Sequence, residues 1–204
     1  MTGDASGWIV PPEAEQSGFV IDAVMADPLA RIVLERAHGL GLPDWALMAG
    51  AVYKSVWNAQ TGRKPGYGIN DYDLAYFDAR DLGAAAEAAV VGPAEARFAD
   101  LPVPVEVCNQ ARVHIWFNEA YGTRREPLTD TTDALRHFAS MTHAVAIRLD
   151  HEGQPELLAP FGLDAVFSRT IRPMPDLAGP EAWNRKIGEQ ARLWPELEFV
   201  AAPV

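Results

Sequence analysis

The chain has 204 residues, of which 49% are hydrophobic and 22% charged, so it can bury a sizeable core and general disorder is disfavoured. Its 17 basic and 28 acidic residues give a net charge of −11, which argues against a nucleic-acid partner. A single cysteine, Cys108, excludes an internal disulfide. No apolar stretch is long enough to span a membrane, and no basic segment followed by an apolar one opens the chain. These features predict a soluble cytoplasmic protein.

No internal repeat, low-complexity tract or long linker divides the chain. Residues 1–17 are polar and contain Gly and Pro, so we predict that they form a loosely ordered lead-in. Residues 18–204 are then expected to form a single domain with a C-terminal helical extension. Strands and helices alternate early in this domain, and a hairpin and helices follow. This order is typical of an α/β or α+β domain.

The first predicted helix has Asp27 as its cap, Pro28 in its first turn and Gly39 at its end. A buried strand, DWALMAG, follows and stops at Gly50, where a helix begins that runs to Gly62. The Gly- and Pro-rich loop RKPGYGIN then leads to the strand DYDLAYFD. The helix DLGAAAEAAVV and the alternating strand VPVEV complete this half of the chain.

In the second half, NQARVHIWFNEAYG is predicted to be helical. Another helix opens at DTTDALRHFA, with Asp130 and Asp133 as a capping pair. The segments HAVAIRLD and ELLAPFG are predicted to form a hairpin around HEGQP. LDAVFSRTIRP predicts a short helix halted by Pro173, and a last helix begins near Pro180 and continues to Trp194.

Two aspartates stand one residue apart at the start of the strand DYDLAYFD. Residues two apart in a strand face the same side, about 7 Å apart, so Asp71 and Asp73 are expected to point together. Glu106 on the next strand, VPVEV, can join them. Three carboxylates gathered in this way repel one another unless a cation lies between them, and Mg²⁺ prefers such ligands. The alternative is a turn in which Asp71 caps backbone amides while Glu106 is simply solvated.

The segment LMAGAVYKSVW predicts a strand, a glycine and then a helix. The free N–H groups and positive end of such a helix can hold phosphate oxygens, and Gly50 lacks a Cβ that would keep a ligand away. The alternative is that Gly50 serves only a tight turn. No Gly-Lys-Ser/Thr follows it, so the turn is not a P-loop.

The order of these features is similar to that in the nucleotidyltransferase superfamily. From Leu42 to Leu197 the chain resembles a bacterial nucleotidyltransferase-like family, notably in GYGINDYDLAYFD, VEVCNQARVHIWF, LLAPFGLDAVFSRTIRP and RLWPEL. The resemblance implies an α+β fold, with a mixed sheet flanked by helices, a C-terminal hairpin and a helical extension. It also implies an enzyme that uses Mg²⁺ or Mn²⁺ to transfer a nucleoside monophosphate from a nucleoside triphosphate (NTP) to an acceptor, releasing pyrophosphate. The alternative is a non-catalytic nucleotide-binding or protein-interaction module on the same fold.

The resemblance also implies the roles of individual residues. Asp71 and Asp73 correspond to the catalytic, metal-binding pair, and Glu106 corresponds to the third carboxylate, which has the same two roles. Gly50 corresponds to the glycine beside the phosphates, and Ala51 stands where the superfamily usually has Ser or Gly.

Other polar residues are weaker candidates for binding the nucleotide. Lys54 can supply a charge to the phosphates, and Asn109 can contact a sugar or base. Arg112 can clamp a phosphate with its planar guanidinium, although an ion pair with a nearby acidic residue is an equally good interpretation. We interpret Lys186 and Arg192, on the last predicted helix, as residues of a solvent face.

Overall fold

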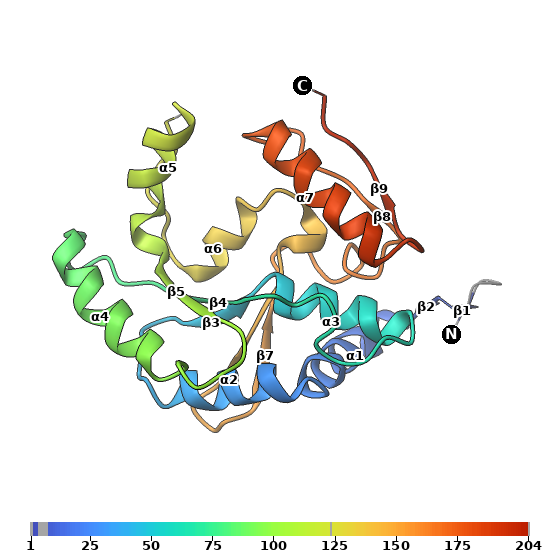
Figure 1. Ribbon diagram of the computed structural model, residues 1–204, viewed down its shortest axis with the longest axis horizontal. Coiled ribbons are helices and arrows are strands. Elements are labelled where there is room, and N and C mark those ends of the chain that lie inside the picture. Colours follow the sequence, from blue (N-terminus) through green and yellow to red (C-terminus); the bar gives the residue numbers. More distant parts are fainter. Residues whose placement is uncertain (1, 4–7, 123, 204) are drawn as a thin grey trace.

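The computed structural model describes residues 2–3, 8–122 and 124–203. A mixed five-stranded sheet with the strand order β5-β4-β3-β6-β7 forms its centre (Figure 1). Strands β4 and β5 are parallel, and the other neighbours are antiparallel. The strands are β3 (Ala46–Met48), β4 (Tyr72–Tyr76), β5 (Val105–Asn109), β6 (Ala146–Leu149) and β7 (Pro155–Leu158). The predicted α+β fold is therefore confirmed, including the hairpin β6–β7.

Helices cover the sheet on both faces. In Figure 1, α1 and α2 lie below the sheet, and α5, α6 and α7 lie above it. None of the helices in the described ranges is long and apolar enough to cross a membrane. The helices are α1 (Glu13–Met25), α2 (Pro28–His38), α3 (Gly50–Gln60), α4 (Ala84–Ala96), α5 (Val113–Tyr121), α6 (Thr131–Arg136) and α7 (Pro180–Leu193), with the 3₁₀ turns η1 (Gln110–Arg112) and η2 (Met141–His143).

The predicted cap of α2 is confirmed and also joins this helix to the sheet. The Asp27 side chain accepts a hydrogen bond from the Leu29 amide at 3.0 Å, and Pro28 occupies the first turn. The second carboxylate oxygen of Asp27 accepts one from the Tyr72 hydroxyl at 2.5 Å. Because Asp27 and Tyr72 are both buried, this pair fixes the start of β4, next to the predicted metal-binding aspartates.

Two predictions about local structure differ from what is observed. Helix α1 begins at Glu13, inside the predicted lead-in, because Val20, Ala23 and Val24 recur at helical spacing and are buried. Of that lead-in, residues 1 and 4–7 lie outside the described residues.

The predicted helix LDAVFSRTIRP is wrong. There, β8 (Thr170–Ile171) pairs in parallel with β9 (Glu198–Phe199). The Ser168 hydroxyl bonds to both the amide and the carbonyl of Thr170, and such local bonds compete with helix formation.

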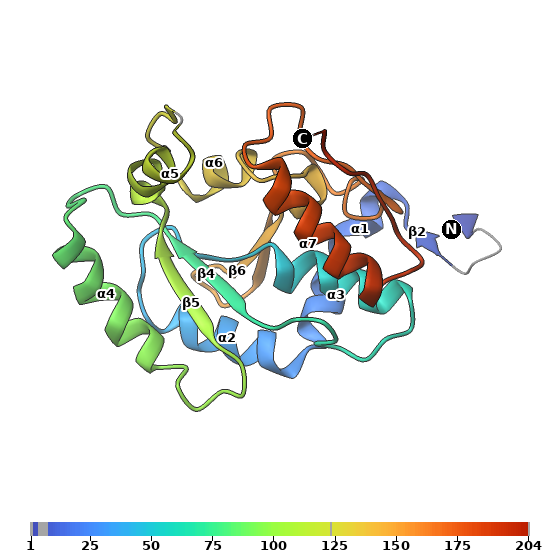
Figure 2. The same cartoon turned by 45° about the horizontal axis from the view of Figure 1, so that its top comes forward.

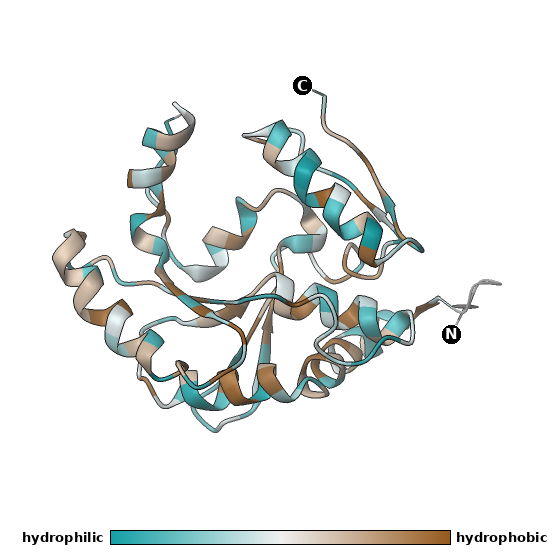
Figure 3. Ribbon diagram, in the orientation of Figure 1, coloured by the Kyte–Doolittle hydropathy of each residue, from teal (hydrophilic) through white to brown (hydrophobic). Residues whose placement is uncertain are grey.

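The last helix packs against α3 and η2 through a narrow apolar stripe. In Figure 3, α7 is mostly hydrophilic with isolated hydrophobic positions, and its buried residues are Trp183, Ile187 and Gln190. Just beyond α7, the fully buried Trp194 meets Trp57 of α3 edge to face, with ring centroids 5.2 Å apart. This contact fixes α7 beside α3, and thus beside the strands that carry the carboxylates.

Candidate functional site

The carboxylates predicted from the sequence share one face of the sheet. Asp73 and Glu106 are register partners on the parallel strands β4 and β5, which lie side by side in Figure 2, so their side chains leave the sheet in the same direction. Asp71 lies just before β4, close enough for its charge to raise the pKa of Asp73. The flanking Val105 and Val107 are buried on the opposite face. The shared face follows from the alternation of the two strands together with their register.

Asp73 is under electrostatic strain. Burial in its recess, together with the neighbouring Asp71 and Glu106 carboxylates, raises the pKa of Asp73 to about 6, although Lys186 and Lys54 partly oppose this shift. The side chain is nonetheless accessible to solvent, because it stands in the floor of a cavity. Repulsion among these carboxylates is what a bound cation would relieve.

The turn from β3 into α3 ends beside Asp73. Met48, the last residue of β3, is the register partner of Asp73. The next residue, Ala49, has a φ of 48°, a conformation that is uncommon outside glycine and is often found at functional sites. No described side chain caps α3, so amides of its first turn, from Gly50 and Ala51, are open to an outside acceptor. The Ala51 side chain itself is buried in the core.

Lys54 lies across this helix start. A Cβ added to Gly50 would stand 3.6 Å from the Lys54 Nζ atom, so the ammonium covers the space next to the glycine. Nζ donates a hydrogen bond to the Gly68 carbonyl at 3.0 Å. Burial lowers the pKa of Lys54, and the Asp71 carboxylate opposes this. Of the residues predicted to hold phosphates, Gly50 and Lys54 are therefore adjacent to each other and to the carboxylates.

The glycine-rich loop before β4 is held from two sides. Gly68 has a φ of +69°, and a Cβ there would stand 2.5 Å from Cη2 of the buried Trp194. On the other side, the Asn58 side chain donates to the Tyr67 carbonyl at 2.9 Å and accepts from the Trp194 indole at 3.1 Å. This loop ends at Asp71, so its fixed shape places the first carboxylate.

Lys186 completes the charged part of the site, contrary to our interpretation of it as a solvent-face residue. It lines the cavity together with Asp73 and Glu106. Burial lowers the pKa of Lys186, and the Asp73 and Asp71 carboxylates oppose this. The only sequence signal is its place beside the apolar stripe of α7, next to Ile187. Arg192, by contrast, is exposed as predicted.

A buried polar cluster lies behind these lysines. The Gln190 side chain donates to the Tyr53 hydroxyl at 2.9 Å, and His143 stacks on the Tyr53 ring at a centroid distance of 4.4 Å. Burial lowers the pKa of His143 well below its usual value, and Lys186 and Lys54 lower it further. The cluster therefore joins α3, η2 and α7 without adding positive charge.

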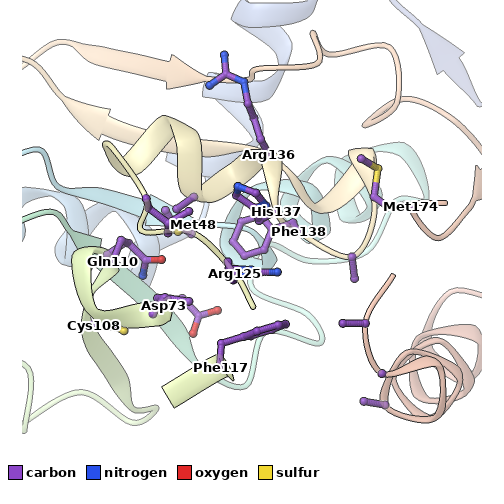
Figure 4. A pocket seen from close by; sticks show the side chains of 18 of the residues that line it. Met48, Asp73, Cys108, Gln110, Phe117, Arg125, Arg136, His137, Phe138 and Met174 are labelled. Atoms are coloured by element: carbon purple, nitrogen blue, oxygen red, sulfur yellow. The ribbon is translucent and has the colours of Figure 1, made fainter. Parts of the chain in front are cut away.

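Asp73 and Glu106 open into a cavity of about 570 Å³, whereas Asp71 is not among the residues that line it. Its floor is formed by β3, β4 and β5, including Asp73 and Glu106, and its walls come from α5, α6 and α7 and the segments beside them. In Figure 4, the Asp73 carboxylate points into this space, opposite Phe138 and beside Arg125 and Phe117. The size is typical of a small-molecule site.

Two predicted binding residues have structural partners instead. Asn109 is buried, and its side chain bonds to both backbone groups of Asp78 and to the Ala111 amide. Arg112 forms an ion pair with Glu87 and donates to the Leu82 carbonyl at 2.9 Å. Neither residue lines the cavity, so the acidic-pair interpretation of Arg112 fits the structure.

The side chains of Asp71, Asp73 and Glu106 have the chemistry of ligands for a divalent cation, but they do not converge closely enough to form a metal site. Across residues 2–3, 8–122 and 124–203, no group of three or more His, Cys, Asp or Glu side chains is arranged to hold a metal ion. However, Asp71, Asp73 and Glu106 offer only oxygen donors, and burial together with the charges of Asp71 and Glu106 raises the pKa of Asp73. Hard oxygen ligands in this number suit Mg²⁺ or Mn²⁺, which also bind phosphate oxygens.

The strain on Asp73 predicts how stability depends on pH without metal. Folding raises the pKa of Asp73 from 3.8 to about 6, so the folded state binds more protons and loses stability as the pH rises from about 4 to 6. Because Asp73 is solvent-accessible, we expect a loss of about 1 kcal/mol. Urea unfolding in chelator at pH 4.5 and 7.5 measures this, with Asp73→Asn as the reference that shares all other titrating groups. A wild-type minus variant difference that does not change with pH would contradict the prediction.

The mixed sheet, with the start of α3 beside Asp73 and with Glu106 on the neighbouring strand, has the arrangement expected from the resemblance to nucleotidyltransferases. The chain belongs to the nucleotidyltransferase family, which it matches over residues 35–199. Its fold is that of a protein described as a CCA-adding enzyme head domain, with a TM-score of 0.74 and 21% identity over 97% of this chain and 100% of that one.

Two structures of tRNA-processing enzymes are more distantly similar. Each has a TM-score of 0.47, with 17% and 19% identity, and the matches cover 94% and 82% of this chain and 45% and 43% of theirs. This likeness is too loose to support a conclusion about substrates. A search of curated proteins found no match.

Proposed function

We propose that the protein transfers a nucleoside monophosphate from an NTP to an acceptor and releases pyrophosphate. The observation that carries this proposal is the register of Asp73 and Glu106, which places both carboxylates on one face beside the start of α3. Membership of the nucleotidyltransferase family supports it.

In the proposed reaction, an acceptor oxygen forms a bond to the α-phosphorus, the bond from that phosphorus to the bridging oxygen breaks, and pyrophosphate leaves. Asp71, Asp73 and Glu106 would hold Mg²⁺ or Mn²⁺. When bound, the cation would neutralise charge that develops on the phosphoryl oxygens. Glu106 faces the cavity and is placed to accept the proton that the acceptor loses.

The leaving pyrophosphate would lie on the side of α3. There the open amides of Gly50 and Ala51 and the ammonium groups of Lys54 and Lys186 can meet its negative charge. The burial of both lysines strengthens such contacts, because water screens them less. Asn109 and Arg112, which have structural partners elsewhere, take no part in the proposed binding of the nucleotide.

The acceptor is proposed to be a small molecule or a protein rather than a nucleic acid. The net charge of −11 repels a polyanion at long range.

The proposal is tested by incubating the protein with α-³²P-labelled NTPs, Mg²⁺ and a cell extract as the source of acceptors. We expect label to enter a product, and pyrophosphate to be released, with Mg²⁺ but not with excess chelator. Treating the product with nuclease or protease, or filtering it by size, distinguishes the acceptor classes. If Mg²⁺–NTP raises the melting temperature but no extract yields a labelled product, the alternative of a non-catalytic nucleotide-binding module is supported instead.

A further inference from the structure

The cavity has an aromatic end as well as a charged one. Trp116 and Phe117 from α5 and Phe138, just after α6, line it together with Arg125. In Figure 4, Phe117 and Phe138 lie on either side of the space into which Asp73 points. Phosphate groups need cations and amides, so they give no reason for aromatic rings in the same cavity as the carboxylates.

The side chain of Trp116 is unusually exposed for a large aromatic residue. It is 49% exposed, the largest value among the large hydrophobic side chains that are exposed in the described part of the chain. Its ring lies against Phe117 with centroids 5.8 Å apart. An exposed indole at the wall of a cavity leaves apolar surface in water, and a ligand ring laid on it would remove that surface.

A second flat surface lies beside it. The Arg125 guanidinium stands 3.7 Å from the centroid of the Phe117 ring. The backbone of Arg125 is tied to α5, since its amide donates to the Asn118 side chain at 2.6 Å and its carbonyl accepts from that side chain at 3.1 Å. These ties hold the segment after α5 against the aromatic rings, so the flat surfaces are placed before a ligand arrives.

We propose that this aromatic end binds the nucleobase of the NTP by stacking on Trp116. This inference rests on the proposed function, which places the reacting phosphate beside Asp73 and Glu106 at the other end of the same cavity. A cavity of about 570 Å³ that joins Asp73 to Trp116 can hold both parts of one nucleotide. Because every base has a π face, stacking discriminates only modestly among bases, so all four NTPs should bind.

The test compares a ligand that has a base with one that lacks it. The affinities of Mg²⁺–tripolyphosphate and of the Mg²⁺ complexes of the four α,β-methylene NTP analogues, which cannot be cleaved at that position, are measured by calorimetry. We expect Trp116→Ala to weaken the analogues about tenfold or more and to leave tripolyphosphate unchanged. Trp116→Phe keeps a flat ring and should recover most of the affinity.

Met141→Ala is the matched control, because Met141 is a similarly exposed hydrophobic residue, at 45%, that does not line the cavity. It should change neither affinity. Equal losses for both ligands in Trp116→Ala would overturn the inference, as would unchanged analogue affinity, which would leave this end to the acceptor. Failure of the proposed function gives other results: neither ligand binds to the wild type with Mg²⁺ if the phosphate site is absent, and both bind but no extract yields a labelled product if the module is non-catalytic.

Discussion

Asp73→Asn is expected to lower Mg²⁺-dependent transfer by about a thousandfold or more. An amide keeps the shape of the side chain but removes the charge that would hold a cation and one of its oxygen ligands. Loss of several kcal/mol of charge stabilisation corresponds to this factor, at 1.36 kcal/mol for each factor of ten. The rate is measured as pyrophosphate release or as incorporation of label under saturating Mg²⁺.

A second aspartate near the same strand provides the control. Asp78 lies two residues beyond the end of β4 and forms an ion pair with Arg80 at 2.6 Å, outside the cavity. Asp78→Asn should retain transfer within about twofold, because an exposed ion pair contributes little. Both variants should remain folded, and Asp73→Asn should be the more stable one at pH 7.5. Wild-type transfer by Asp73→Asn would exclude the proposed metal site.

Gly68→Ala is expected to destabilise the fold by about 2–5 kcal/mol. A left-handed residue other than glycine costs about 1–2 kcal/mol, and overpacking a core costs about 1–3 kcal/mol more. The clash is with Trp194, which is fully buried and hydrogen-bonded to Asn58, so the ring cannot move away cheaply. The melting temperature should fall by about 5–15 °C.

Gly41→Ala separates the two causes of this loss. Gly41 has a φ of +65°, but nothing lies within 4 Å of the position a Cβ would take. This variant should show only the backbone cost, about 1–2 kcal/mol. If the two variants lose the same stability in calorimetric or urea unfolding, the contact between the loop and Trp194 contributes nothing.

Local sequence signals predicted the parts of the fold in which neighbouring residues along the chain determine the backbone conformation. The cap at Asp27, the pair Asp130 and Asp133, and the alternation around Glu106 all act within a few residues, and each of these elements is observed. The shared face of Asp73 and Glu106 also follows from strand alternation, once the two strands pair. In the structure, Asp130 accepts from the Asp133 amide and Asp133 accepts from the Thr129 amide, as a capping pair requires.

Features that depend on distant segments could not be read from the sequence. Lys186 is one charged residue on an amphipathic helix, and the docking of α7, through contacts such as Gln190 with Tyr53 and Trp194 with Trp57, places it near Asp73. Arg112 carried a plausible signal for phosphate binding, but Glu87 lies close enough in space to pair with it. The aromatic wall at Trp116 depends on where α5 stands above the sheet, which no periodicity indicates.

Lys186 follows the strands that carry the carboxylates in the chain, and this order has a consequence for how the site is assembled. Strands β4 and β5 leave the ribosome well before α7, so the crowded carboxylates of a nascent chain lack the ammonium group that later faces them. The contact between Trp194 and the loop at Gly68 also forms only after α7 has been synthesised. A chain truncated before α7 is therefore expected to lack both the ammonium group that faces Asp73 and the indole that packs against Gly68.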